Sequence, residues 1–134
     1  MSYSLEQARH LYNVAFALGL SGAELLKDSD TVIRECNGIG ADWMPDLMRR
    51  AATELNPVME VPAAIHDRRY SIGTTRADRQ FADDEFLANC RTTIDATYPW
   101  YRPARYIYRR RARRYYGYLR AFGSAAFNTG SPRL

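Results

Sequence analysis

The chain reads PAAIHDRRYSIGTTRADRQF over residues 62–81, and this stretch predicts two helices joined by a tight turn. Pro62 suits the first position of a helix, and Gly73 suits its end. Thr75 then starts a second helix that reaches about Thr97. Because the link between the two helices is so short, we expect them to pack as an antiparallel pair.

The rest of the chain carries helical patterns and little strand signal. We expect further helices over residues 5–20, 44–55 and 103–122, and a short helix near Glu24 that runs out before residue 31. The helix over residues 103–122 has apolar side chains at steps of three and four, backed by arginines. The predicted fold is therefore mainly α.

Length and composition set the domain organisation. A chain of 134 residues, 46% of them hydrophobic, can bury its own core. We expect one domain over residues 1–123, followed by a flexible C-terminal tail over residues 124–134. The two cysteines, Cys36 and Cys90, are either free thiols or one bridge.

Two absences in the sequence bear on location. No run of about 20 apolar residues exists, so we expect no transmembrane segment. The apolar stretch over residues 14–20 lacks a basic lead, so we expect no signal peptide. We therefore expect cytoplasmic synthesis, with delivery by another route or within a particle.

Charge is divided unevenly along the chain. Residues 1–95 contain 10 basic and 15 acidic side chains, whereas residues 96–134 contain nine arginines and no acid. Seven of the ten tyrosines lie between Tyr98 and Tyr118. Tyrosine favours membrane interfaces, and each arginine near an anionic leaflet adds about 1 kcal/mol of attraction. The pattern predicts a membrane-binding surface formed by Arg109, Arg110, Arg111, Arg113 and Arg114.

The basic segment has two other interpretations. Its arginines could form a solvated helix face that pairs with the acidic remainder of the chain. They could also bind nucleic acid through phosphate contacts and aromatic stacking, although no nucleic-acid motif supports this. Nucleic acid is therefore an unlikely partner.

Three motifs follow one another in the middle of the chain: Gly38-x-Gly40, His66-Asp67-x-x-Tyr70 and Asp78-x-x-Phe81. Together they resemble the calcium loop, the catalytic helix and the opposing helix of phospholipase A2. The likeness is closest to cysteine-poor members, such as those in viral capsid proteins. It covers roughly residues 36–90.

The resemblance implies calcium-dependent hydrolysis of the sn-2 ester of glycerophospholipids, with a membrane surface or a larger particle as partner. It implies that His66 is the general base, that Asp78 orients its ring, and that Tyr70 hydrogen-bonds this acid. A histidine suits the role because it accepts a proton near neutral pH. The implied Ca²⁺ ligands are the Asp67 carboxylate and the carbonyls of Cys36, Gly38 and Gly40, with the Gly38 amide as oxyanion donor.

Each assignment has a structural alternative. Asp78 follows Thr75 by three residues, which by itself spells a helix-capping box. Asp83 and Asp84 are rival partners for His66, but they fall with arginines on the polar side of their helix. The two glycines could form a simple turn, and Asn37 or Asp42 could replace loop carbonyls as metal ligands.

A function from a different class also fits the sequence. The chain could be a non-catalytic virion or assembly component. Its arginine-rich helix would then bind a membrane, nucleic acid or an acidic protein partner.

Overall fold

The computed structural model describes residues 3–36 and 44–129, and this part of the chain is mainly helical. It contains seven α-helices, one 3-10 helix and no strand, which confirms the predicted mainly α class. The elements are α1 (Leu5–Leu18), η1 (Ala23–Leu26), α2 (Ser29–Glu35), α3 (Asp46–Leu55), α4 (Glu60–Ile72), α5 (Arg76–Thr97), α6 (Pro103–Phe122) and α7 (Ser124–Thr129).

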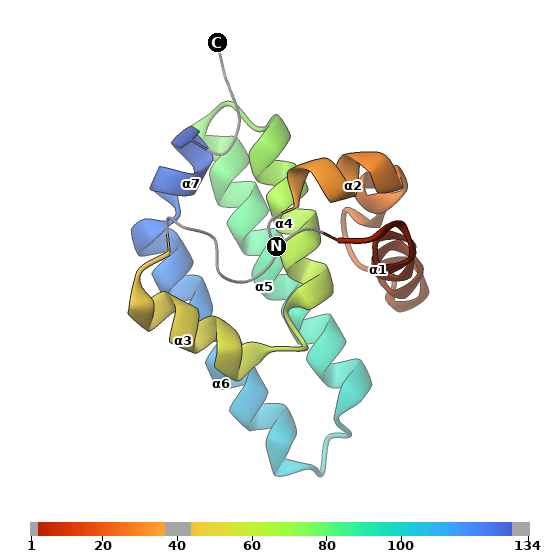
Figure 1. The fold of residues 1–134 in the computed structure, drawn as a ribbon. Coiled ribbons are helices and arrows are strands. Elements are labelled where there is room, and N and C mark those ends of the chain that lie inside the picture. Colours follow the sequence, from red (N-terminus) through yellow and green to blue (C-terminus); the bar gives the residue numbers. More distant parts are fainter. Residues whose placement is uncertain (1–2, 37–43, 130–134) are drawn as a thin grey trace.

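The α4–α5 hairpin forms the centre of the molecule (Figure 1). The two helices run antiparallel and are joined by residues 73–75. On one side α4 packs against α1, η1 and α2, while on the other side α5 packs against α6, which in turn packs against α3. The hairpin is therefore covered on both sides by other helices, and its facing side chains are shielded from water.

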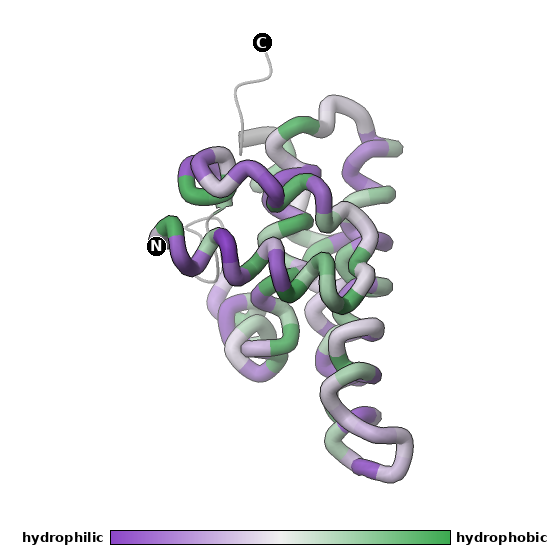
Figure 2. The backbone as a smooth tube through the Cα atoms, turned by 90° about the vertical axis from the view of Figure 1, so that its right-hand side faces the viewer, coloured by the Kyte–Doolittle hydropathy of each residue, from purple (hydrophilic) through white to green (hydrophobic). Residues whose placement is uncertain are grey.

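The core has two main clusters, one on each side of α4. The first joins α3, α5 and α6 and contains Met48, Leu55, Phe86, Ile94 and Leu119. The second joins α1, η1, α2 and α4 and contains Leu11, Leu26, Val32 and Ile65. Full burial of each such side chain stabilises the fold by roughly 1.5–3 kcal/mol. Figure 2 shows hydrophobic and hydrophilic residues alternating along the helices, as amphipathic packing requires.

Local capping accounts for several helix ends. Ser4 and Gln7 form a capping box at the start of α1, and Thr75 and Asp78 form one at the start of α5. The helix α1 ends at Gly19, which is in the left-handed conformation, so it stops before the predicted residue 20. The helix α4 begins at Glu60, two residues before Pro62, because the first helical turn tolerates a residue without an N–H.

A seven-residue helix, α2, occupies a region where the sequence predicted an end of helix. The Asp28 side chain caps it by accepting from the backbone N–H of Asp30 at 3.1 Å and from the Thr31 hydroxyl at 2.8 Å. The run of polar residues that suggested a loop therefore includes the capping signal of a new helix.

The segment after α6 also differs from its prediction. Residues 124–129 form α7, where the sequence predicted a flexible tail. Its Phe127 is buried and meets the ring of Tyr70 edge-on, with centroids 5.1 Å apart. This apolar contact fixes α7 across the end of the hairpin; the remaining predicted tail, residues 130–134, lies outside the described residues.

A polar clamp ties the N-terminal layer to the hairpin. The Ser21 backbone exchanges two hydrogen bonds with the Asn89 side chain, at 3.0 and 2.9 Å. The Ser21 hydroxyl donates to Glu85 at 2.6 Å, and Arg69 donates two bonds of 3.0 Å to the same carboxylate. Glu85 is buried, and the paired donors offset the cost of removing its charge from water.

Both cysteines are buried free thiols, so the bridged alternative is wrong. No helix within residues 3–36 and 44–129 has the length and hydropathy needed to cross a bilayer.

Candidate active site

A histidine and an aspartate meet in the buried contact between α4 and α5. His66 Nε2 lies 2.7 Å from Asp83 Oδ1, and the exposed fractions of the two side chains are 7% and 0%. The His66 ring also contacts the edge of Phe86, with centroids 5.6 Å apart. Packing and the hydrogen bond thus hold the imidazole in one orientation.

Tyr70 completes this arrangement from one turn further along α4. Its hydroxyl donates to the same Asp83 Oδ1 at 2.7 Å, and the centroids of its ring and the His66 ring are 4.0 Å apart. The spacing of four residues places both side chains on one helix face, as the sequence predicted. The predicted hydrogen bond from Tyr70 to the acid that orients His66 is present, but it reaches Asp83 rather than Asp78.

Two arginines contact the other oxygen of Asp83. Arg120, near the end of α6, donates to Oδ2, and Arg79 Nε lies 3.8 Å from the same atom. Arg79 also donates to the Tyr70 hydroxyl at 3.3 Å. One buried carboxylate therefore joins α4, α5 and α6, and its charge is balanced from two directions.

These contacts decide the protonation of the acid and the phenol. Burial works to raise the pKa of Asp83, but hydrogen bonds from His66, Tyr70 and Arg120 outweigh it and hold the pKa below its ordinary value. Burial, together with the nearby Asp83 charge, raises the pKa of Tyr70. Near neutral pH the pair is thus an ionised carboxylate and a neutral phenol, which lets Tyr70 donate its proton in the hydrogen bond.

The predicted partner of His66, Asp78, has a different role. Its carboxylate accepts from the backbone N–H groups of Thr74 at 2.9 Å and Thr75 at 3.1 Å, which lowers its pKa. It is the capping-box residue of α5 and does not reach His66. The prediction failed because Asp78 stands only three residues into α5, beside the turn, whereas His66 lies deeper in the hairpin.

Two signals in the sequence point to Asp83. His66 precedes Gly73 by seven residues and Asp83 follows Thr75 by eight, so an antiparallel pair brings them to the same level. The Asp-x-x-Phe pattern also occurs twice, and Asp83 with Phe86 is its second copy. Of the arginines on the polar side of α5, Arg79 is one of the two groups that balance the charge of Asp83; the other, Arg120, comes from α6.

The predicted metal ligands are only partly within the described residues. Gly38 and Gly40, as well as the alternatives Asn37 and Asp42, lie outside them. Cys36 is described, and its thiol donates to the Ala64 carbonyl oxygen at 3.4 Å.

The half-buried Asp67 follows Ala64 by three residues on the same face of α4. Burial, with the Asp67 charge as the next cause, raises the pKa of the Cys36 thiol. Residues 3–36 and 44–129 contain no group of three or more metal-ligating side chains. The predicted ligand set has one carboxylate and three carbonyls, so it depends on the backbone of residues 36–40.

The predicted membrane-binding arginines divide into two groups. Arg109 pairs with Asp95 at 2.7 Å, while Arg111 and Arg114 contact the carbonyl and the carboxylate of Glu54 at 3.0 and 3.4 Å. Arg109 and Arg114 thus pair with acidic side chains, as the alternative interpretation expected, whereas Arg111 donates to a backbone carbonyl. Arg110 and Arg113 are exposed and have no partner among the described residues.

An exposed aromatic tip lies where α5 meets α6. Trp100 is 72% exposed and Tyr101 is 64% exposed, and Tyr106 and Ile107 are also exposed on the first turns of α6. Both ribbon and tube views show this connection extending beyond the other helices (Figure 1, Figure 2). We call these four residues the aromatic tip.

Comparison of the chain with protein-family models, curated proteins and solved structures gives no match.

Proposed function

We propose that this chain is a phospholipase A2-like esterase that hydrolyses the sn-2 ester of glycerophospholipids. In this proposal α4 is the catalytic helix and α5 is the opposing helix. One observation supports it above all: His66 Nε2 meets the buried carboxylate of Asp83 at 2.7 Å while Tyr70 donates to the same oxygen. A histidine oriented by a buried acid is an arrangement that serves general-base catalysis.

The hydrogen bond assigns the two ring nitrogens different tasks. Since the ionised Asp83 accepts from Nε2–H, the neutral ring keeps its lone pair on Nδ1, which makes no hydrogen bond to any described residue. Nδ1 removes a proton from a water molecule as the water oxygen bonds to the ester carbonyl carbon. Asp83 stabilises the resulting imidazolium, and general-base help of this kind contributes about 10²–10⁴ in rate.

The same histidine completes the reaction. When the carbon–oxygen bond of the ester breaks, Nδ1–H returns the proton to the leaving alkoxide. The products are a fatty acid and a lysophospholipid, and His66 regains its starting protonation state. Tyr70 takes no proton in this scheme; it holds the Asp83 oxygen in place.

Calcium is the ion that the resemblance implies, and the chemistry of the proposed ligands suits it. The Asp67 carboxylate and the carbonyls of Cys36, Gly38 and Gly40 are all oxygen ligands, which this hard cation prefers. The thiol contact between Cys36 and Ala64 supports this choice, because it brings residue 36 beside the helix face that carries Asp67. Bound Ca²⁺ would polarise the ester carbonyl and stabilise its developing negative charge. The Gly38 N–H would donate to the same oxygen.

Membrane attachment is a separable part of the proposal. The aromatic tip offers interfacial side chains, and the neighbouring Arg102 and Arg110 offer positive charge. From Asp83 to the end of α5 is 14 residues, or about 21 Å of helix. Docking through the tip alone would thus hold His66 well away from the bilayer, so adhesion and hydrolysis need separate measurements.

The exposed tip also favours a second candidate function. A non-catalytic interaction or assembly protein would use the aromatic tip and its arginines for binding, and would need no water-activating histidine. Substituting Trp100 and Tyr101 by alanine would then abolish its only activity, whereas substituting His66 would leave that activity unchanged.

The test is release of fatty acid from vesicles of mixed phosphatidylcholine and phosphatidylglycerol that carry a labelled sn-2 chain. We expect release in the presence of calcium and none after EDTA, with Asp67→Asn as inactive as the EDTA sample. Release that is unaffected by EDTA contradicts the metal role. Absence of release, combined with vesicle binding that depends on Trp100, favours the second candidate.

A further inference from the structure

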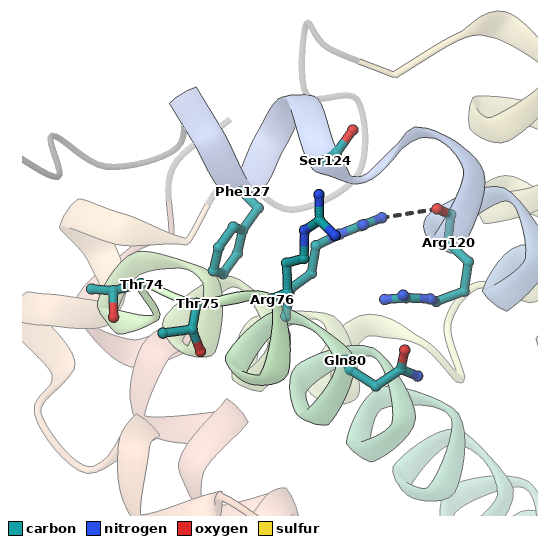
Figure 3. Close-up of a pocket in the computed structure, with 8 residues that line it drawn as sticks. Thr74, Thr75, Arg76, Gln80, Arg120, Ser124 and Phe127 are labelled. Atoms are coloured by element: carbon teal, nitrogen blue, oxygen red, sulfur yellow. Dashed lines mark hydrogen bonds between the residues drawn. The ribbon is translucent and has the colours of Figure 1, made fainter.

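A cavity is lined in part by Arg79 and Arg120, the two arginines that contact Asp83. It has a volume of about 580 Å³ and lies between the start of α5, the end of α6 and α7 (Figure 3). Its described lining residues are Thr74, Thr75, Arg76, Arg79, Gln80, Arg120, Ser124 and Phe127. This volume is within the range of small-molecule sites, and three guanidinium groups and no acidic side chain line it.

Two of the three arginines are held in place by the fold. Arg79 donates to the carbonyl oxygens of Leu119 at 3.0 Å and Arg120 at 2.9 Å, and the second of these bonds is drawn in Figure 3. Arg120 is held by its bond to Asp83. A guanidinium has five N–H donors, so each of these side chains keeps unused donors. Their orientation is fixed before any ligand arrives, which lowers the entropy cost of binding.

The third arginine is available to a ligand. Arg76 is exposed and forms no hydrogen bond or ion pair with any described residue. It rises from the first turn of α5 toward Ser124 on α7, with Phe127 beside it (Figure 3). Asp83 balances one of the charges of Arg79 and Arg120, so positive charge in the cavity exceeds what its contacts neutralise.

Side chains rather than helix amides provide the donors. The backbone N–H groups of Thr74 and Thr75 already donate to Asp78, so they are not available to a ligand. The hydroxyl of Ser124 lies on the α7 side of the cavity, opposite Arg76, and adds a neutral donor. The ring of Phe127 adds an apolar wall.

We propose that this cavity binds a phosphate ester, with Arg76, Arg79 and Arg120 around the phosphate and Phe127 against the organic part. Guanidinium groups match phosphate oxygens through paired N–H donors. A bare ion would leave most of about 580 Å³ unused, so the volume favours an esterified phosphate. The site does not depend on hydrolysis at His66.

The test uses the whole chain labelled with ¹⁵N and follows backbone amide shifts during titration. The probes are inorganic phosphate and glycerol 3-phosphate, with sodium chloride at matched ionic strength as the blank. We expect saturable shifts for residues 74–80, 120 and 124–127 with the phosphates only. Tighter binding of glycerol 3-phosphate than of inorganic phosphate supports a phosphate ester as the ligand, and equal binding of the two contradicts it in favour of free phosphate.

Two variants decide whether the cavity is the site. Arg76→Gln removes a side chain without described partners, so the fold is retained, and we expect binding about tenfold weaker. Arg91→Gln is the matched control, because Arg91 is an exposed arginine on the same helix, about 22 Å away. We expect it to bind as the unmodified chain does. Equal loss in both variants, or no shift with either phosphate, overturns the proposal.

Discussion

His66 and Asp83 stand 17 residues apart in the sequence, yet their side chains meet at 2.7 Å in the interior of the α4–α5 hairpin. The same aspartate accepts from Tyr70 and from Arg120, so α4 and α6 both contact α5 through one carboxylate. A charge removed from water at this depth is tolerated only because each of its oxygens has donors. The contact thus holds α4, α5 and α6 together as well as forming the candidate catalytic pair.

Asp83 and Asp78 should differ sharply when each is replaced by asparagine. Asp83→Asn leaves Arg79 and Arg120 without their counter-charge, and we expect the free energy of unfolding to fall by about 3 kcal/mol. Asp78→Asn weakens only an exposed helix cap, so its effect should be clearly smaller. Urea unfolding followed by circular dichroism measures both. Equal losses of unfolding free energy would show that Asp83 does not hold the helices together.

Acid should unfold the chain partly through Asp83. Its pKa is lower in the folded chain than in the unfolded chain, where an aspartate has a pKa of about 4. Its contribution is therefore fully present above about pH 4 and is lost as the pH falls through the lower, folded value. We expect Asp83→Asn to flatten the dependence of unfolding free energy on pH below about pH 5. An unchanged slope would mean that other carboxylates control acid unfolding.

Gly22 should not accept a side chain. It has a φ of +83°, and an added Cβ would lie 2.8 Å from Ile65 Cγ2 and 3.1 Å from a Glu85 oxygen. We expect Gly22→Ala to destabilise the fold by roughly 1–3 kcal/mol, because strain and crowding act together. Gly117→Ala is the control, since Gly117 lies within α6 with nothing within 4 Å of its added Cβ. It should stabilise the chain by roughly 0.5–1 kcal/mol. Thermal unfolding compares the two.

The salt bridges at the base of the aromatic tip should respond to ionic strength. Asp95 accepts from Arg109 at 2.7 Å and from Arg105 at 2.9 Å, and these bonds lower its pKa to about 2. Because the carboxylate is partly exposed, solvent screening limits its contribution to about 1 kcal/mol. We expect Asp95→Asn to cost that amount in low salt and less in 1 M salt, where the screening length is roughly 3 Å. A loss independent of salt would indicate a packing effect instead.

The helices were predictable because their signals are local. The Thr75 cap and the proline at residue 103 set the starts of α5 and α6, and periodic apolar residues set their extent. The helix α7 gave no such signal, since six residues after a glycine are too few to show a period. Its order comes from the contact of Phe127 with Tyr70, which is a tertiary interaction.

The candidate site was predictable only in part, for a physical reason. His66 and Tyr70 share a helix face through a local spacing, and that spacing can be read directly. The choice between Asp78 and Asp83 depends on the register of one helix against another. Counting residues outward from the turn selects Asp83, whereas the Asp-x-x-Phe motif occurs at both aspartates and does not distinguish them. The arginine on α6 that balances Asp83 is 37 residues away, and no local pattern predicts it.

The most direct measurement compares fatty-acid release by the unmodified chain, His66→Gln, Asp83→Asn and Asp78→Asn, all with calcium and with folding verified by circular dichroism. General-base catalysis by His66 predicts loss of at least about 100-fold for the first two variants, in line with its usual contribution, and a nearly unchanged rate for Asp78→Asn. A folded His66→Gln variant that releases fatty acid at the rate of the unmodified chain would contradict it.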